Sequence, residues 1–240
     1  MENLRRPLLR YMGSKFTLAK HYPVPLYETI VEPFAGGAGY AHRYPWKRII
    51  LCELNPAVAS CWSWLISASV DEIMNLPVEL PVGTDIRTLS ISSGAKELIR
   101  RWQRVGRNDC WTISNWNNKP GLWQESVKIS ICESLPKIRH WEVFCGSYSE
   151  LPNNEHVTTL VDAPYQHVKA YAKEFEQIDY GHLGNWCQGR KGQVIVCEQQ
   201  GADWLPFEPF KELTCCKNRG KKNTHKSKEV IWTKGCNETL

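Results

Sequence analysis

A glycine-rich loop between two apolar runs constrains the fold of this 240-residue chain more than any other feature. The first run covers residues 29–34, and the second covers residues 48–52. The glycines of the loop are Gly36, Gly37 and Gly39. Glycine permits a tight turn and a close approach of the backbone to a ligand, and a following helix would direct free N–H groups at that ligand. The pattern predicts a strand, a ligand-binding loop and a second strand.

The acid Glu53 ends the second apolar run, about 15 residues after the glycines. In nucleotide-binding α/β folds, an acid at this offset binds ribose hydroxyls. The match to the dinucleotide-binding fingerprint is loose, because the third glycine of that motif is missing. A glycine loop alone, or an acid at a strand end alone, is more often structural. Together and in this order they favour an adenosine-containing ligand.

A later apolar run, residues 159–161, ends in Asp162, Ala163, Pro164 and Tyr165. The carboxylate can accept a hydrogen bond from the exocyclic amine of a flat ring. The turn can direct a backbone carbonyl at the same amine, and the tyrosine offers a stacking face. By itself, an apolar run that ends in Asp and Pro is more often an ordinary strand-to-loop turn. The interpretation as a base-binding turn depends on the glycine loop and the acid that precede it.

Four motifs occur in the order found in Dam-type DNA adenine methyltransferases, and the chain resembles that family. They are residues 10–15, 32–39, 53–55 and 162–165. The phage-type members of the family have segments similar to residues 137–143, 192–198, 201–207 and 229–232. The resemblance covers most of the chain, with residues 67–135 and 215–228 matching poorly. It implies S-adenosylmethionine as cofactor and the N6 amine of an adenine in double-stranded DNA as acceptor, as in phage DNA methylation or restriction-modification.

The resemblance also implies which residues form the site. The expected cofactor-binding residues are Tyr11, Lys15, Phe34, Ala35, Gly36, Gly37, Gly39, Glu53, Leu54, Ser147 and Tyr148. The expected catalytic residues are Asp162, Ala163, Pro164 and Tyr165.

Two positions depart from the family pattern. Ala163 replaces the first proline of Asp-Pro-Pro-Tyr, and it retains the backbone carbonyl that acts there. Ser147 replaces an acid that usually binds the adenine amine of the cofactor; serine accepts a hydrogen bond but brings no charge. These departures leave open the hypothesis of a methyltransferase-fold protein that binds DNA or cofactor with impaired catalysis.

The expected chemistry depends on the lone pair of the acceptor amine. That lone pair is delocalised into the ring, and hydrogen bonds to Asp162 and to the carbonyl of Ala163 would favour a pyramidal nitrogen. Holding both reactants for in-line attack on the sulfonium methyl supplies much of the rate. The base must leave the duplex, with Tyr165 stacking on it. The same chemistry serves N4 of cytosine, which stays the alternative acceptor, and an RNA methyltransferase is a further hypothesis.

Two basic segments are the expected DNA contacts. The first is a helix-like stretch at residues 94–106, and the second is the acid-free run 217–228. The contact residues would be Arg100, Arg104 and Arg107 in the first segment and Lys221, Lys222 and Lys226 in the second. The arginines share one helical face by their spacing. A uniformly positive loop suits a phosphate backbone, although a solvated hairpin loop explains it equally well.

Strands alternate with helices over most of the chain, which predicts an α/β, doubly wound, Rossmann-like sheet. The expected strands are 29–34, 48–52, 142–146, 157–162 and 193–198, with a hairpin at 209–215 and 229–233. The expected helices are 13–21, 38–43, 55–66, 94–105, 124–134 and 179–188. Residues 68–136 interrupt the alternation and are expected to form an inserted, mainly helical DNA-recognition lobe. Residues 1–67 and 137–240 would then form the methyltransferase domain.

Composition sets the outer limits. Apolar residues make up 42% of the chain, enough for a sizeable core, and the net charge of +5 is mild. No apolar stretch would span a membrane, and the first residues lack the apolar region of a signal peptide. We therefore expect a monomer or weak dimer in the cytoplasm of a bacterium or phage-infected cell, with its ten cysteines reduced. No spacing of Cys or His suits a metal, and none is expected.

Overall fold

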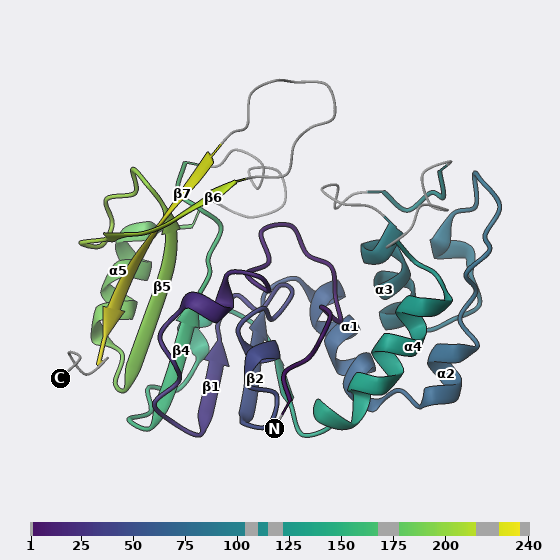
Figure 1. Ribbon diagram of the computed structural model, residues 1–240, viewed down its shortest axis with the longest axis horizontal. Coiled ribbons are helices and arrows are strands. Elements are labelled where there is room, and N and C mark those ends of the chain that lie inside the picture. Colours follow the sequence, from purple (N-terminus) through teal and green to yellow (C-terminus); the bar gives the residue numbers. More distant parts are fainter. Residues whose placement is uncertain (1, 104–109, 115–121, 168–177, 215–225, 236–240) are drawn as a thin grey trace. The chain divides into compact units, whose positions relative to one another are not determined.

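The computed structural model describes residues 2–103, 110–114, 122–167, 178–214 and 226–235. Within these ranges, seven strands form a mixed sheet in the order β3-β2-β1-β4-β5-β7-β6 (Figure 1). The order reverses between β1 and β4, and in doubly wound sheets ligands bind outside the carboxyl ends of the strands at such a point. The expected α/β class is confirmed.

The strands are β1 (Thr29–Glu32), β2 (Arg48–Glu53), β3 (Glu142–Cys145), β4 (Val157–Val161), β5 (Gln193–Gln199), β6 (Glu208–Thr214) and β7 (Lys226–Lys234). The α-helices are α1 (Pro56–Ser67), α2 (Val70–Met74), α3 (Ser93–Gln103), α4 (Glu125–Ser134) and α5 (Tyr180–Gly189). Short 3-10 helices are η1 (Ala19–His21), η2 (Ala41–Arg43), η3 (Ile86–Thr88), η4 (Leu135–Lys137) and η5 (Tyr148–Glu150). Each strand expected from the sequence is present, with its start or end shifted by a few residues at most.

The chain divides into two compact units. The first consists of Met1–Tyr22 and Ala35–Tyr148, and the second consists of Pro23–Phe34 and Ser149–Leu240. Residues 68–136, the expected inserted lobe, belong to the first unit, where α3 packs on α1 and α4 packs on α2. The helical content expected of this segment is therefore present. Its role in DNA recognition stays a prediction.

In the first unit, local sequence signals fix the starts of α1 and α2. The side chain of Asn55 accepts a hydrogen bond from the backbone N–H of Ala57 at the start of α1, and Pro56 occupies the first turn, where no N–H is needed. Ser69 and Glu72 form a reciprocal capping box on α2. These caps set the start of α1 directly after the carboxyl end of β2.

In the second unit, β4 lies between β1 and β5 in parallel pairs, and all of its residues are buried. Parallel strands covered on both faces are rich in β-branched and apolar residues, and β4 contains two valines, two threonines and one leucine. The antiparallel hairpin β6–β7 follows β5, with β7 pairing to β5 and to β6. Figure 1 shows α5 beside β5 within this unit. The order of parallel strands followed by a hairpin gives the sheet its mixed character.

Two of the expected helices are wrong. Residues 13–21 form only the 3-10 turn at their end, and residues 38–43 form only the turn η2. Gly13 has φ of +82° and Ala38 has φ of +49°, both in the left-handed region, which ends a right-handed helix at that residue. The hydrophobic pattern of these segments comes from their packing against each other and not from a helical face.

Candidate functional site

The glycine loop of the first unit lies against the N-terminal segment 11–16. A Cβ atom on Gly36 would lie 3.0 Å from Cδ1 of Tyr11, and one on Gly39 would lie 2.7 Å from the backbone nitrogen of Phe16. Gly36 also has φ of +43°, which favours glycine. The motifs at residues 10–15 and 32–39 therefore pack against each other, and the contact requires glycine at positions 36 and 39.

A buried hydroxyl lies at the same contact. A Cβ atom on Gly37 would lie 2.9 Å from Oγ of Ser14. This Oγ is buried and has no hydrogen-bond partner within the described part of the chain. Leaving a buried polar group unpaired costs about 1–3 kcal/mol, so a polar ligand atom beside the loop would recover that cost. Ser14 was not among the expected site residues.

The carboxylate of Glu53 closes the glycine loop. Its Oε2 accepts the backbone N–H of Gly36 at 3.0 Å, and its Oε1 accepts that of Asn55 at 2.9 Å. Glu53 is 5% exposed. Burial raises the pKa of this carboxyl, while backbone hydrogen bonds from Asn55, Gly36 and Leu54 and the charge of Arg101 oppose the shift.

Residues that follow β2 and β3 lie at one edge of the first unit. Glu53 pairs with Cys145 in the parallel register, and the backbone N–H of Gly146 donates to the carbonyl of Glu53 at 3.2 Å. Residues 147–148, both expected to bind cofactor, follow directly. Leu54 is 59% exposed at the same end. The register therefore brings together four expected cofactor residues from distant parts of the sequence.

The remaining expected cofactor residues lie in both units. Ala35 is buried, and its backbone N–H donates to the carbonyl of Cys52 at 3.0 Å. This hydrogen bond joins the start of the glycine loop to β2. Lys15 is 7% exposed, and its Nζ donates to the carbonyl of Gly13 at 2.9 Å. Phe34 follows β1 and belongs to the second unit. The first unit thus contains all but one of these residues.

Arg101 supports the loop from the helix α3. Its guanidinium carbon lies 4.7 Å from the centre of the Tyr11 ring, and its Nε donates to Oε1 of Glu97 at 2.6 Å. Nη2 of Arg100 contacts the same carboxylate oxygen at 2.5 Å. Burial alone would raise the pKa of Glu97, but hydrogen bonds and charges from the two arginines lower it below its usual value. This buried cluster holds two guanidiniums on one carboxylate.

Arg100, expected to contact DNA, is used inside the first unit. Its side chain is 9% exposed, and its guanidinium lies 4.6 Å from the centre of the Trp111 ring. The hydrogen bonds to Glu97 use Nε and Nη2 of Arg100. The side chains of the other expected DNA contacts lie outside the described residues: Arg104, Arg107, Lys221, Lys222 and Lys226. DNA contact at these positions stays a prediction.

His42 joins the N-terminal segment to the glycine loop. The backbone N–H of Leu8 donates to its Nε2 at 3.1 Å, so Nδ1 holds the proton and donates to the carbonyl of Ala38 at 2.5 Å. Burial lowers the pKa of this imidazole to about 4, partly offset by the bond to Ala38, so the ring is neutral at pH 7. This role of His42 could not be predicted from the sequence, in which the histidines show only that they lack the spacing of metal ligands.

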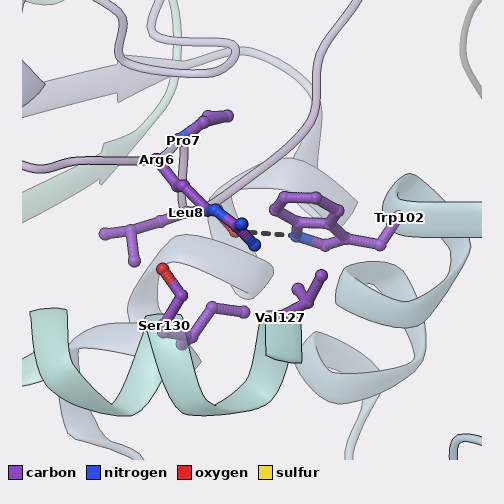
Figure 2. A pocket seen from close by; sticks show the side chains of 7 residues that line it. Arg6, Pro7, Leu8, Trp102, Val127 and Ser130 are labelled. Atoms are coloured by element: carbon purple, nitrogen blue, oxygen red, sulfur yellow. Dashed lines mark hydrogen bonds between the residues drawn. The ribbon is translucent and has the colours of Figure 1, made fainter. Parts of the chain in front are cut away.

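A second feature of the N-terminal segment is a small apolar pocket, shown in Figure 2. It is lined by Arg6, Pro7, Leu8, Trp102, Val127, Ser130 and Ile131. The indole N–H of Trp102 donates to the carbonyl of Leu8 at 3.0 Å. The interior has no space for the centre of a water-sized sphere. It is therefore a packing contact of the segment with α3 and α4, and not a ligand site.

In the second unit, the turn after β4 begins beside the end of β1. Val31 pairs with Thr159, so the carboxyl ends of the two strands are neighbours at the reversal of strand order. Asp162 is partly exposed and Ala163 is 4% exposed. This end of the sheet is where doubly wound folds bind their ligands.

Two hydroxyl groups hold the turn that contains Pro164 and Tyr165. The hydroxyl of Tyr180 donates to the carbonyl of Pro164 at 2.7 Å. Burial, together with the charge of Glu198, raises the pKa of Tyr180 to about 12, so this phenol remains a donor at neutral pH. The hydroxyl of Tyr165 donates to the carboxylate of Glu229 on β7.

The carboxylate of Glu198 holds the next residue of the turn. Its Oε2 accepts the backbone N–H of Gln166 at 3.1 Å and the indole N–H of Trp204 at 3.0 Å. Its Oε1 accepts the backbone N–H of Gln199 at 2.7 Å. Glu198 is 1% exposed, and burial raises its pKa against these hydrogen bonds. Glu198, Trp204 and Glu229 lie in segments that resemble the family, but no role was expected for them.

No family model and no curated protein matches this chain. Among the described residues, no helix is long and apolar enough to cross a membrane. No cluster of three or more His, Cys, Asp or Glu side chains in the same part of the chain is arranged to hold a metal ion.

Proposed function

We propose that the chain is a DNA methyltransferase of the Dam type, which uses S-adenosylmethionine to methylate the N6 amine of adenine. The first unit would bind the cofactor, and the turn after β4 in the second unit would bind the target base. The observation that supports this most is the closed loop around Gly36. Three motifs, at residues 10–15, 32–39 and 53–55, meet there through a glycine contact and a carboxylate hydrogen bond.

The residues of the loop fit the cofactor chemically. Glu53 offers acceptors for two ribose hydroxyls, and charge-assisted hydrogen bonds of this kind are strong. Ser14 offers a buried hydroxyl that the described chain leaves unpaired. The exposed side chain of Leu54 would cover one face of the adenine ring. When bound, S-adenosylmethionine supplies an electrophilic methyl group on a sulfonium.

The turn after β4 would orient the acceptor amine. Asp162 and the carbonyl of Ala163 accept hydrogen bonds from its two N–H groups and leave the nitrogen lone pair directed at the methyl carbon. S-adenosylmethionine would supply the methyl group and keep the bonding electrons of the broken S–C bond, and Asp162 or water would take the proton that the methylated amine releases. The contribution of the turn is orientation, which requires it to be rigid. The hydrogen bonds from Tyr180 and to Glu198 support that rigidity.

The experiment uses the purified chain, S-adenosylmethionine with a labelled methyl group, and duplex DNA of mixed sequence. Nucleoside digestion should yield labelled N6-methyladenine. Asp162→Asn should lower the rate more than tenfold, about 1.4 kcal/mol of barrier. Asp179→Asn is the matched control, because Asp179 caps α5 through its Oδ1 and asparagine preserves that cap.

Other outcomes distinguish the alternatives. Labelled N4-methylcytosine would make the chain a cytosine methyltransferase with the same amine chemistry. Label in RNA but not in DNA would reassign the acceptor. Binding of DNA or cofactor without any transfer would support the impaired protein suggested by Ala163 and Ser147. We expect the activity in the cytoplasm of a bacterium or phage-infected cell, from a monomer or weak dimer.

A further inference from the structure

A buried acid on β7 binds the tip of the tyrosine that follows β4. Glu229 is 6% exposed and accepts a hydrogen bond from the hydroxyl of Tyr165. It pairs with Gln199 in the antiparallel register of β5 and β7. Because β4 pairs with the other side of β5, this carboxylate reaches the turn from two strands away. A carboxylate buried to this extent is costly unless it is hydrogen-bonded.

This contact differs from the other two that hold the turn. Tyr180 and Glu198 bind backbone groups, the carbonyl of Pro164 and the N–H of Gln166, so they fix the path of the chain. Glu229 binds the end of a side chain. A phenolic O–H prefers to lie in the plane of its ring, so an acceptor at a fixed place beside the hydroxyl favours one ring plane. The Glu229 contact therefore restrains both the position of the hydroxyl and the plane of the ring.

We infer that Glu229 is a positioning residue for base capture: it holds the ring of Tyr165 in the plane on which the extruded base stacks. This inference rests on the proposed function. Stacking of a base on an aromatic ring contributes about 1–3 kcal/mol and depends on parallel faces. Loss of the Glu229 contact would reduce the population of extruded base without changing cofactor binding or the methyl-transfer step for a base already captured.

The test uses a duplex with the sequence that the wild-type chain methylates, mapped beforehand by long-read sequencing. In one form, 2-aminopurine replaces the target adenine, and its emission rises when it leaves the stack. Glu229→Leu should raise the KM for DNA about tenfold, the ratio expected for losing one hydrogen bond to a charged group. The 2-aminopurine emission and the single-turnover rate at saturating DNA should fall together, because both follow the population of extruded base, while the dissociation constant of S-adenosylmethionine stays within about threefold.

Two further variants separate positioning from stability. Glu229→Gln retains an acceptor oxygen for the hydroxyl and should restore the KM and the emission. In the Glu229→Leu background, Tyr165→Phe should cause no further loss, because the two groups act as one pair. Glu212→Leu on β6 is the control: it removes an acid from the same hairpin, but one whose side chain is 53% exposed. It should behave as wild type.

The outcomes are distinguishable. If folded Glu229→Leu methylates and extrudes the base as wild type does, Glu229 has no positioning role and the proposed function stands. If Glu229→Leu does not fold, judged by its thermal melt, the single variant Tyr165→Phe tests the same contact, with Glu229→Gln as its control. A wild-type KM and emission in Tyr165→Phe would overturn the inference. If the wild-type chain neither methylates DNA nor extrudes 2-aminopurine, the proposed function fails and the inference fails with it.

Discussion

The guanidinium carbon of Arg101 lies 4.7 Å from the centre of the Tyr11 ring. Arg101 belongs to α3, within the segment expected to recognise DNA, whereas Tyr11 packs on the glycine loop of the cofactor motif. The first unit therefore uses a helix of residues 68–136 to support the loop. Residues 68–136 match the family motifs poorly, yet Arg101 of this segment contacts Tyr11, which belongs to one of those motifs.

We predict that Arg101→Met weakens binding of S-adenosylmethionine about tenfold. The change removes a cation–π contact, which contributes about 1–2 kcal/mol when desolvated, and a positive charge that favours ionised Glu53. Glu97 keeps Arg100 as its partner. Calorimetry on the folded variant checks the prediction, and unchanged affinity would show that the loop does not depend on Arg101.

A methyl group on Gly39 should destabilise the first unit. Its Cβ atom would lie 2.7 Å from the backbone nitrogen of Phe16, and backbone cannot move aside as a flexible side chain can. Gly39→Ala should lower the free energy of unfolding by about 1–3 kcal/mol. Gly189→Ala is the control, because a Cβ atom there has no neighbour within 4 Å. Urea denaturation of both variants gives the comparison, and equal midpoints would contradict the packing described.

The neutral imidazole of His42 predicts a pH dependence of stability. Its pKa is about 4 in the folded chain, against an ordinary value of 6.5, so the unfolded chain binds more protons between these values. Stability from this group is fully present above about pH 6.5 and is lost as the pH falls through 4, with a slope of up to about 1.4 kcal/mol per pH unit. Chemical denaturation across this range measures the slope. His42→Gln should reduce it, and an identical slope in a folded variant would mean that other groups cause it.

Ser147→Asp should tighten binding of S-adenosylmethionine. Ser147 follows the paired ends of β2 and β3, close in sequence to Gly146, which bonds to Glu53. A carboxylate there would make a charge-assisted hydrogen bond to the adenine amine, about twice as strong as the neutral one. We expect a gain of about three- to tenfold in affinity. Weaker binding would indicate that the residue does not face the adenine.

The central strands were predictable from the sequence because of their burial. β4 is buried along its whole length, and a strand covered on both faces is rich in β-branched and apolar residues. The same holds for most of β5. Acids and glycines that follow such runs mark their carboxyl ends. The positions of Glu53 and Asp162 at strand ends could therefore be predicted without knowledge of any contact.

The supporting contacts could not be predicted, because they join residues far apart in the chain. Tyr165 and Glu229 are separated by 64 positions, and nothing local to either one indicates the other. The left-handed conformation of Ala38 was equally hidden, since alanine rarely adopts it and gives no signal when it does. The expected helix at 38–43 failed for this reason.

The contact between Leu8 and Trp102 spans 94 positions of the chain. The N-terminal segment is translated before its partners on α3, which emerge only after most of the first unit has been made. Until then the glycine loop lacks the side chain of Arg101, and Leu8 lacks the indole of Trp102. Completion of the loop is therefore a late event in the biosynthesis of this unit, although its motifs are translated before α3.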